Sequence, residues 1–271
     1  MGKLVCAAAM SHVLGTPTDI EEQAERVFQG MREIGRAIRE SSPDVLVVIS
    51  SDHLNNFNLG DPKPLAIATA ASLQPYGDMG IPTELIRGHS EFAVGFADFV
   101  ALSNSGLTLA QVDDVKPDHG VMIPLAITDP ERSIPVVPLY INTVYSESPT
   151  PAECWQLGTL LQQYIGDQRP AKERIAVLAC GGLSHWLGVP EEGHVNEEWD
   201  RNFMRQLLGE VPCRVNTLTN KEILSEAGNG GLEVNAWITL AAALPRLQGE
   251  VVFYEAIPLW ASGMAGVQFT V

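Results

Sequence analysis

The chain has 271 residues, of which 45% are hydrophobic and 18% are charged, and its formal net charge is -16. This charge argues against a nucleic-acid-binding surface, because such a surface needs a basic patch. No apolar run reaches the length of a membrane span, and the N-terminus lacks a basic segment followed by an apolar stretch, so we expect a cytoplasmic protein.

The first two predicted strands both lead to a histidine. Residues 3–9 form the first strand, before His12, and residues 45–49 form a second, wholly apolar strand, before His53. The segment between them has apolar residues at helical spacing, so the three elements form a parallel strand–helix–strand unit. We expect the two strands to be neighbours. Both histidines then lie at the edge where open α/β sheets bind their ligands.

Strands and helices alternate along the rest of the chain. The patterns predict strands over residues 65–70, 107–112, 134–141, 174–180 and 250–256, helices over residues 83–102, 121–126, 151–165, 196–208, 220–227 and 232–244, and an apolar tail over residues 257–271. Pro135 and Pro138 favour irregular or edge pairing for their strand. The alternation indicates an α/β fold with a mixed, mostly parallel central sheet flanked by helices, in a single domain over residues 1–271.

Four of the six histidines follow predicted strands and lie in short polar or glycine-bearing turns: His12, His53, His119 and His185. A lone histidine in such a turn is more often a hydrogen-bonded structural residue, but four in the same context raise the joint odds of metal binding or catalysis. His89, within a predicted helix, and His194, in a charged loop, are better explained by a solvated or capping role.

The residue types suggest two kinds of metal site. Two imidazoles and one carboxylate on one face of the metal are the ligands of non-haem Fe(II) oxygenases, and three histidines are typical of a catalytic zinc site. Histidines that do not bind the metal suit acid and base roles, because imidazole titrates near neutral pH. Glu233, in the first turn of a predicted helix, is by position more often a charge that stabilises the helix dipole, and Glu255 is a rival carboxylate.

Six short motifs follow one another along nearly the whole chain. They are Met10-Ser11-His12, Ser51-Asp52-His53-Leu54-Asn55, Pro117-Asp118-His119-Gly120 with Pro124-Leu125, Gly181-Gly182-Leu183-Ser184-His185, Trp199-Asp200-Arg201-Asn202-Phe203, and Gly230-Gly231-Leu232-Glu233 followed by Trp237. Each motif alone is weak, but the ordered set resembles the class III extradiol ring-cleavage dioxygenases. That family includes the β subunit of protocatechuate 4,5-dioxygenase and 2,3-dihydroxyphenylpropionate dioxygenase.

The resemblance implies roles for five residues of these motifs. It implies that His12, His53 and Glu233 hold Fe(II). His185 resembles the acid–base histidine beside the metal, and His119 resembles a second histidine that contacts a substrate hydroxyl or the proximal region. The match of Gly230-Gly231-Leu232-Glu233 is what favours Glu233 over its rival.

The activity implied by the resemblance is the cleavage of a catechol-type ring, in which both atoms of O2 enter the ring and a semialdehyde acid is formed. Asn55 is a candidate substrate-binding residue. The expected partners are a small aromatic diol and O2, with a homo-oligomer as the base-rate expectation and a small α-type subunit as in some family members. The alternatives are a non-catalytic metal-binding or interaction protein, a zinc hydrolase on the same histidines, and 2-aminophenol in place of a catechol.

Overall fold

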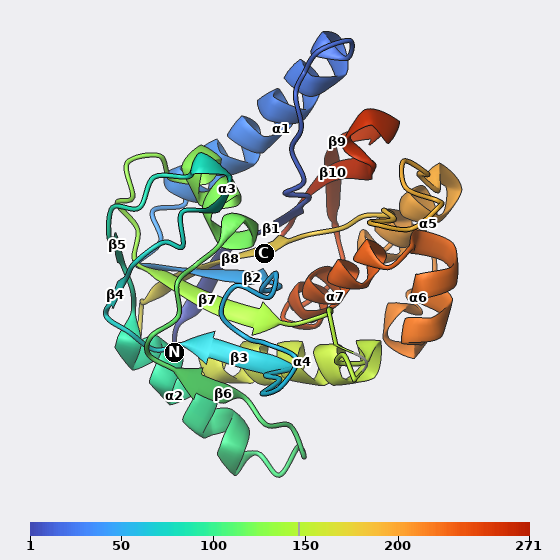
Figure 1. Ribbon diagram of the computed structural model, residues 1–271. Coiled ribbons are helices and arrows are strands. Elements are labelled where there is room, and N and C mark those ends of the chain that lie inside the picture. Colours follow the sequence, from blue (N-terminus) through green and yellow to red (C-terminus); the bar gives the residue numbers. More distant parts are fainter. Residues whose placement is uncertain (146) are drawn as a thin grey trace.

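The structure is a computed structural model that describes residues 1–145 and 147–271 (Figure 1). Within these residues the main sheet has eight strands: β1 (Lys3–Met10), β2 (Val45–Ser50), β3 (Leu65–Ala68), β6 (Ala110–Val112), β7 (Val136–Ile141), β8 (Arg174–Cys180), β9 (Gly249–Ile257) and β10 (Ser262–Phe269). A second, two-stranded sheet pairs β4 (Ser72–Leu73) with β5 (Ile86–Arg87). The helices are α1 (Glu21–Glu40), α2 (Ser90–Leu102), α3 (His119–Thr128), α4 (Pro151–Asp167), α5 (Glu197–Leu207), α6 (Asn220–Ala227) and α7 (Val234–Ala242).

The strand order of the main sheet is β6-β3-β7-β2-β8-β1-β10-β9. The four central strands, β7, β2, β8 and β1, are parallel to one another. On one side β3 pairs antiparallel with β7, and on the other β10 pairs antiparallel with β1 and with β9. The predicted α/β class, with a mixed and mostly parallel sheet, is therefore confirmed.

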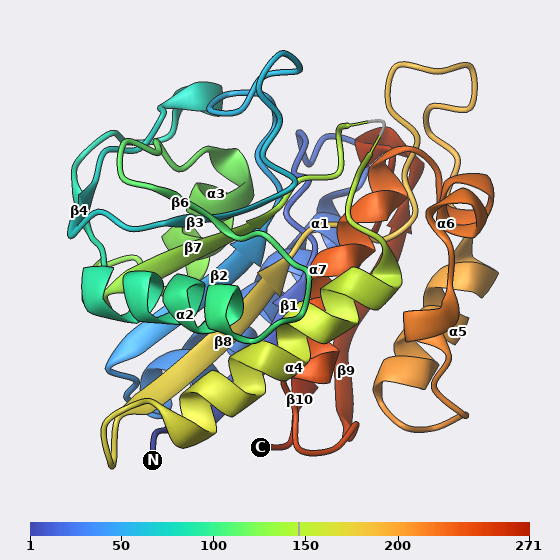
Figure 2. The same cartoon turned by 90° about the horizontal axis from the view of Figure 1, so that it is seen from below.

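Helices cover both faces of this sheet (Figures 1 and 2). α1 and α3 pack on one face, while α2, α4 and α7 pack on the other, and α5 and α6 lie beside each other near the β9–β10 end. The apolar residues divide accordingly into two cores, one on each side of the sheet. Every residue of β2 is buried, which explains why its sequence is a continuous apolar run and not an alternating one.

Local sequence signals determine where several helices begin. Thr150 and Glu153 form a reciprocal capping box at the start of α4, and Pro151 occupies its first turn. Asp118 caps α3, because its side chain accepts a hydrogen bond from the backbone N–H of Gly120 at 3.1 Å. These caps satisfy N–H groups that have no partner within the helix.

The prediction that β1 and β2 are neighbours is wrong. β8 lies between them and pairs in parallel with both, so the strand nearest in sequence is not the nearest in space. The expectation that both histidines lie at one edge of the sheet still holds, because all three strands run in the same direction. His12, His53 and the Gly181–Gly182 turn therefore still meet at one edge of the sheet.

Of the irregular or edge pairing expected for the strand that contains Pro138, the edge position is wrong. β7 lies inside the sheet, between β2 and β3, and Pro138 is in register with Val48 of β2. The ladder with β3 extends only from Leu139 to Ile141, so Pro138 lies beyond its end. The proline is tolerated because no hydrogen bond to β3 is required at that position.

Two further element predictions need correction. The helix expected over residues 83–102 begins only at Ser90, since Ile86–Arg87 forms β5 and His89 caps the helix by accepting a hydrogen bond from Phe92 N–H at 3.2 Å. The tail expected to close the fold contains another strand, β10, which lies between β1 and β9. The capping role favoured for His89 is thus confirmed.

A search of the described residues found no helix with both the length and the apolar character needed to cross a membrane.

Candidate active site

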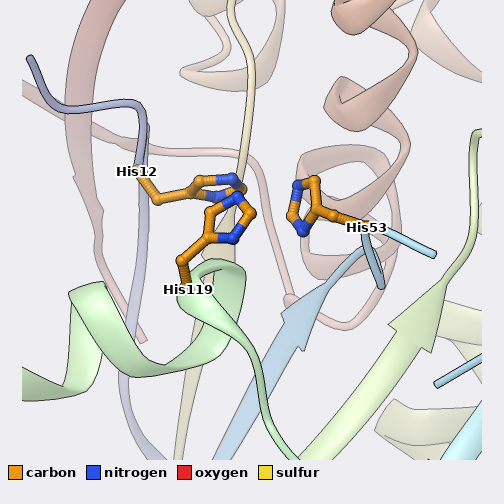
Figure 3. A group of neighbouring side chains, drawn as sticks. All are labelled: His12, His53 and His119. Carbon is orange, nitrogen blue, oxygen red and sulfur yellow. The ribbon is translucent and has the colours of Figure 1, made fainter. Parts of the chain in front are cut away.

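Three histidine rings meet above the carboxyl ends of the parallel strands (Figure 3). His12 follows β1, His53 follows β2, and His119 is the first residue of α3. The ring centroids of His12 and His53 lie 5.2 Å apart, and the ring of His119 lies 5.6 Å from that of His12 and 4.0 Å from that of His53. One ring nitrogen from each of the three lies within 4.8 Å of the others. This spacing is suited to a shared metal ion.

Glu233 lies against these histidines, at the junction between the 3-10 turn η3 (Gly230–Glu233) and α7. Its Oε1 is 3.0 Å from His53 Nε2 and 3.8 Å from His12 Nε2. Burial alone would raise the pKa of Glu233, but the adjacent imidazoles outweigh this effect and hold the pKa well below its ordinary value. The side chain is therefore an ionised carboxylate, the form that binds a metal.

His12 is the most deeply buried of the three histidines, with 1% of its surface exposed. Burial lowers its pKa to about 4, so its ring is neutral. Its Nδ1 atom is buried and has no hydrogen-bond partner among the described residues. Because a buried ring nitrogen without a partner is costly, this atom indicates that the site is built for a group other than the protein's own side chains.

Asp118 orients the ring of His53. Its Oδ2 atom lies 3.0 Å from His53 Nδ1 and accepts the backbone N–H of His53 at 2.9 Å. A carboxylate holds the hydrogen on Nδ1, which turns Nε2 toward Glu233, and this arrangement is common behind metal-binding histidines. Burial by itself lowers the pKa of His53, but the hydrogen bonds with Asp118 and Glu233 outweigh it and raise the pKa to about 10. A metal must therefore displace a proton from this ring.

His119 has a similar partner. Its Nδ1 atom lies 2.5 Å from Asp78 Oδ2, and its backbone N–H donates to the same oxygen at 3.3 Å. Asp78 begins a short 3-10 turn, η1 (Asp78–Gly80), whose flanking Gly77 has a positive φ of 85°. That backbone conformation is open to glycine and rarely to other residues, so the turn that presents Asp78 depends on it.

His185 lies on the other side of Glu233. Its Nδ1 atom is 2.9 Å from the carbonyl oxygen of Leu183, and its Nε2 atom is 3.8 Å from Glu233 Oε2. The second oxygen of Glu233 also accepts the backbone N–H of Gly182 at 2.9 Å. A Cβ atom on Gly230 would come within 2.0 Å of His185 Nε2, so only glycine leaves room for this ring.

The remaining candidates occupy different surroundings. Asn55 Nδ2 donates to Asp118 Oδ2 at 3.2 Å and to Asp78 Oδ2 at 3.4 Å, so this side chain links the two carboxylates that hold His53 and His119. Glu255, the rival to Glu233, lies on β9 and is paired with Arg26 at 2.5 Å. His194 packs against the ring of Trp186.

Sequence reasoning missed the roles of Asp78 and Asp118. Asp118 was recognised only as a turn residue, and its position as a helix cap one residue before His119 gives no sign that it contacts His53. Asp78 is 41 positions away from His119 in the sequence, on a loop. The only available signal was the two glycines beside it, which indicate a tight turn.

A cavity of about 470 Å³ opens beside the cluster, and His53, His185 and Glu233 form part of its wall. A larger cavity of about 800 Å³ shares Ser148 and Asn220 with it but contains none of the histidines. Only the smaller of these two cavities is lined by candidate site residues, so it is the better candidate for a substrate site. Its volume is within the range of small-molecule pockets.

The donor set fits a divalent metal. Once His53 has given up its proton, two neutral imidazoles and an ionised carboxylate offer nitrogen and oxygen ligands of the kind that non-haem iron and zinc accept. A buried ring nitrogen of His12 lacks any other partner. The ring of His53, held by Asp118, and the 3.0 Å distance between His53 Nε2 and Glu233 Oε1 also fit a metal site.

Comparison with known families defines the class of protein. The family model described as the catalytic LigB subunit of aromatic ring-opening dioxygenase matches residues 6–265. This protein therefore belongs to that family of ring-opening dioxygenases. The resemblance to extradiol dioxygenases expected from the sequence motifs is thereby confirmed at the level of the family.

Individual relatives are distant but similar over their whole lengths. An enzyme from Cupriavidus necator named 2,3-dihydroxyphenylpropionate/2,3-dihydroxicinnamic acid 1,2-dioxygenase is 25% identical over 91% of this chain and 90% of its own. An enzyme of the same name from Mycolicibacterium gilvum is 26% identical over 96% of each chain. The crystal structure of uncharacterized protein JW3007 from Escherichia coli K12 covers 98% of this chain with a TM-score of 0.65 and 14% identity, which supports the fold.

Proposed function

We propose that this protein is a non-haem Fe(II)-dependent extradiol dioxygenase that inserts both atoms of O2 into a catechol-type diol and opens the ring to a semialdehyde acid. The observation that carries the proposal is the convergence of His12, His53 and Glu233, with a buried His12 nitrogen that has no partner within the described residues. This ligand set leaves coordination positions for a substrate and O2.

His12, His53 and Glu233 would hold the iron. When bound, the metal supplies a Lewis-acid centre at which the diol and O2 are brought together. Asp118 fixes the ring of His53 with Nε2 facing the other ligands, and the N–H of Gly182 fixes one oxygen of Glu233. These contacts pre-orient the ligands before the metal arrives.

Two further histidines would move protons. His185 has its Nδ1 atom bound to the Leu183 carbonyl, so Nε2 is the atom that exchanges a proton with substrate in the cavity. His119 would accept a proton from a diol hydroxyl through Nε2, because its Nδ1 atom is bound by Asp78. A catechol must lose at least one proton to bind a metal through both oxygens.

A zinc hydrolase is the second candidate, and one observation favours it. His12, His53 and His119 form a three-histidine group whose nitrogens lie within 4.8 Å of one another, as in many catalytic zinc sites. In that arrangement His119 would be a ligand and Glu233 a general base.

Anaerobic reconstitution distinguishes these candidates. Protein loaded with Fe(II), and a matched sample loaded with Zn(II), would be mixed with catechol, protocatechuate, gallate, 2,3-dihydroxyphenylpropionate and 2-aminophenol in an oxygen electrode. The proposal requires O2 uptake and a new yellow product with Fe(II) alone. Iron-loaded protein that consumes no O2 with any of these compounds would contradict it and favour the hydrolase or a non-catalytic role.

A further inference from the structure

The cavity beside the histidine cluster has an uncharged outer wall. Its lining residues other than His53, His185 and Glu233 are apolar or carry neutral polar groups: Thr143, Val144, Tyr145, Ser148, Leu187, Asn220, Leu224, Asn229, Gly230 and Leu232. Among the described residues that line this cavity, none is a lysine or an arginine. A substrate carboxylate would therefore find no opposite charge on this wall.

Two neutral polar residues of the wall, Asn229 and Ser148, are bound to the protein's own backbone. Asn229 binds Leu187 through both ends of its amide, since Oδ1 accepts the Leu187 N–H and Nδ2 donates to the Leu187 carbonyl, each at 2.8 Å. Ser148 Oγ donates to the Tyr145 carbonyl at 2.7 Å. Donors that remain on this wall, among them one hydrogen of Asn229 Nδ2 and the Tyr145 hydroxyl, which has no partner within the described residues, are uncharged.

Asn220 adds an acceptor and no free donor. Its Nδ2 atom donates to the carbonyl oxygens of Ser148 and Pro149 at 3.1 and 3.2 Å, which fixes the orientation of the amide. Its Oδ1 atom is buried and has no hydrogen-bond partner within the described residues. An amide oxygen can only accept hydrogen bonds, so it repels a carboxylate.

Three apolar side chains of the wall are exposed to solvent. Leu187 is 48% exposed, Leu224 is 42% exposed and Val144 is 41% exposed. Exposed leucines and valines that gather beside a small-molecule cavity favour an apolar ligand, because binding removes both apolar surfaces from water. Asn229 holds the Leu187 part of this wall in place.

The neighbouring cavity does not supply the missing charge. Lys63 lines it, but Lys63 Nζ is 2.6 Å from Asp61 Oδ1 and is already paired. Glu147 and Glu153 line the same cavity. A carboxylate that extended from the first cavity into the second would therefore meet more negative than positive charge.

We propose that this site takes a catechol-type diol whose ring substituent is uncharged and apolar, an alkyl or aryl group. It discriminates against substituents that carry a carboxylate, such as the propionate in the names of the curated relatives. This inference rests on the proposed dioxygenase function and adds the chemical class of the substrate.

A matched pair of diols tests the inference. 3-Propylcatechol and 3-(2,3-dihydroxyphenyl)propionate share a three-carbon chain, which ends in a methyl group in the first and in a carboxylate in the second. With Fe(II)-loaded protein, kcat/KM for 3-propylcatechol should be at least about tenfold higher, and anaerobic titration should give a correspondingly lower Kd. The pair 4-methylcatechol and protocatechuate repeats the comparison for a substituent at the other ring position.

A positive charge introduced into the wall tests whether Leu224 contributes to the discrimination between charged and uncharged ring substituents. Leu224→Arg should raise kcat/KM for the propionate by about tenfold and lower it for 3-propylcatechol. Leu102→Arg is the control, because Leu102 is 81% exposed on α2 and lies outside the cavity lining, so both values should stay unchanged.

The outcomes separate the two proposals. A wild-type preference for the propionate overturns this inference and leaves ring cleavage intact. No O2 uptake and no anaerobic binding with any of the four diols, in protein that holds iron, overturns the proposed function and this inference with it. If Leu224→Arg does not raise kcat/KM for the propionate, Leu224 does not line the part of the cavity that holds the ring substituent.

Discussion

Asp118 contacts His53 at two points, the backbone nitrogen at 2.9 Å and the ring Nδ1 at 3.0 Å. We expect Asp118→Asn to weaken Fe(II) binding by about 10- to 100-fold, because the ring loses the charge that holds its hydrogen on Nδ1. Competition with a chelator measures the affinity. Asp113→Asn, at an exposed position five residues earlier, is the control and should bind iron normally. Equal Fe(II) affinity in the two variants would show that Asp118 does not support metal binding.

The proposed ligands can be tested by their metal content. His12→Ala and Glu233→Gln should each lose iron and activity together, because each removes one of three ligands. Glu255→Gln is the matched control. Glu255 lies on β9 and pairs with Arg26, so its substitution should leave the iron content unchanged. Iron is measured by elemental analysis after anaerobic loading and gel filtration. Full retention of iron in His12→Ala or Glu233→Gln contradicts that residue's assignment.

His185 should act on protons and not on the metal. His185→Ala is expected to keep its iron and lose about 10²- to 10⁴-fold in kcat, the usual contribution of a general acid or base. His194→Ala provides the comparison, because His194 packs against Trp186 and is outside the proposed mechanism. The two variants are compared by iron content and steady-state O2 uptake. Unchanged turnover in His185→Ala would exclude it from the reaction.

Gly230 leaves the space that the His185 ring occupies. Gly230→Ala would place a Cβ atom 2.0 Å from His185 Nε2, so the ring must move, and we expect kcat to fall at least about tenfold with iron retained. Gly166→Ala is the control on α4, where an added Cβ meets nothing within 4 Å. It should preserve activity and stabilise the fold by up to about 1 kcal/mol. Wild-type kcat in Gly230→Ala would show that the ring position is not critical.

Asp200 should give the fold a measurable pH dependence. It is fully buried and accepts hydrogen bonds from Ser184 and Tyr254, and burial raises its pKa to about 6 from an ordinary value of 3.8. Between roughly pH 4 and 6 the native state keeps a proton that the unfolded chain has lost. The free energy of unfolding therefore falls as pH rises through this window, by on the order of 2 to 3 kcal/mol from this group.

An asparagine at position 200 does not titrate, so in Asp200→Asn this decrease in the free energy of unfolding with rising pH should disappear. Chemical denaturation of the wild type and the variant at about pH 4.5 and about pH 6.5 measures the difference. Identical changes in unfolding free energy in the two proteins would show that Asp200 titrates normally.

The sequence predicted the parallel part of the fold because each central strand carries its own signal. β2 and β8 are continuous apolar runs, and the histidines that follow β1, β2 and β8 lie at one edge as expected. The order of the strands was not predictable, since nothing local in β1 or β2 indicates that β8 separates them. β10 was missed for a similar reason, because its sequence contains two glycines and its pairing with β1 joins distant parts of the chain.

The metal-site candidates were accessible from the sequence because they occur next to recognisable strands or within motifs. Asp118 and Asp78 were not, because their effect depends on which ring nitrogen they face, and a loop sequence does not specify that. The residues that form the wall of the substrate cavity could also not be predicted from the sequence. Leu187 and Leu224 lie on separate segments, and only the folded chain brings them to the same cavity.

The placement of β10 has a consequence for how the site is assembled. β1, which leads to His12, pairs with β8 on one side and with residues 262–269 on the other. Both pairings join segments that are far apart in the sequence, so the position of His12 depends on contacts that close long loops and are slow to form. A chain without residues 262–269 would leave β1 paired on one side only.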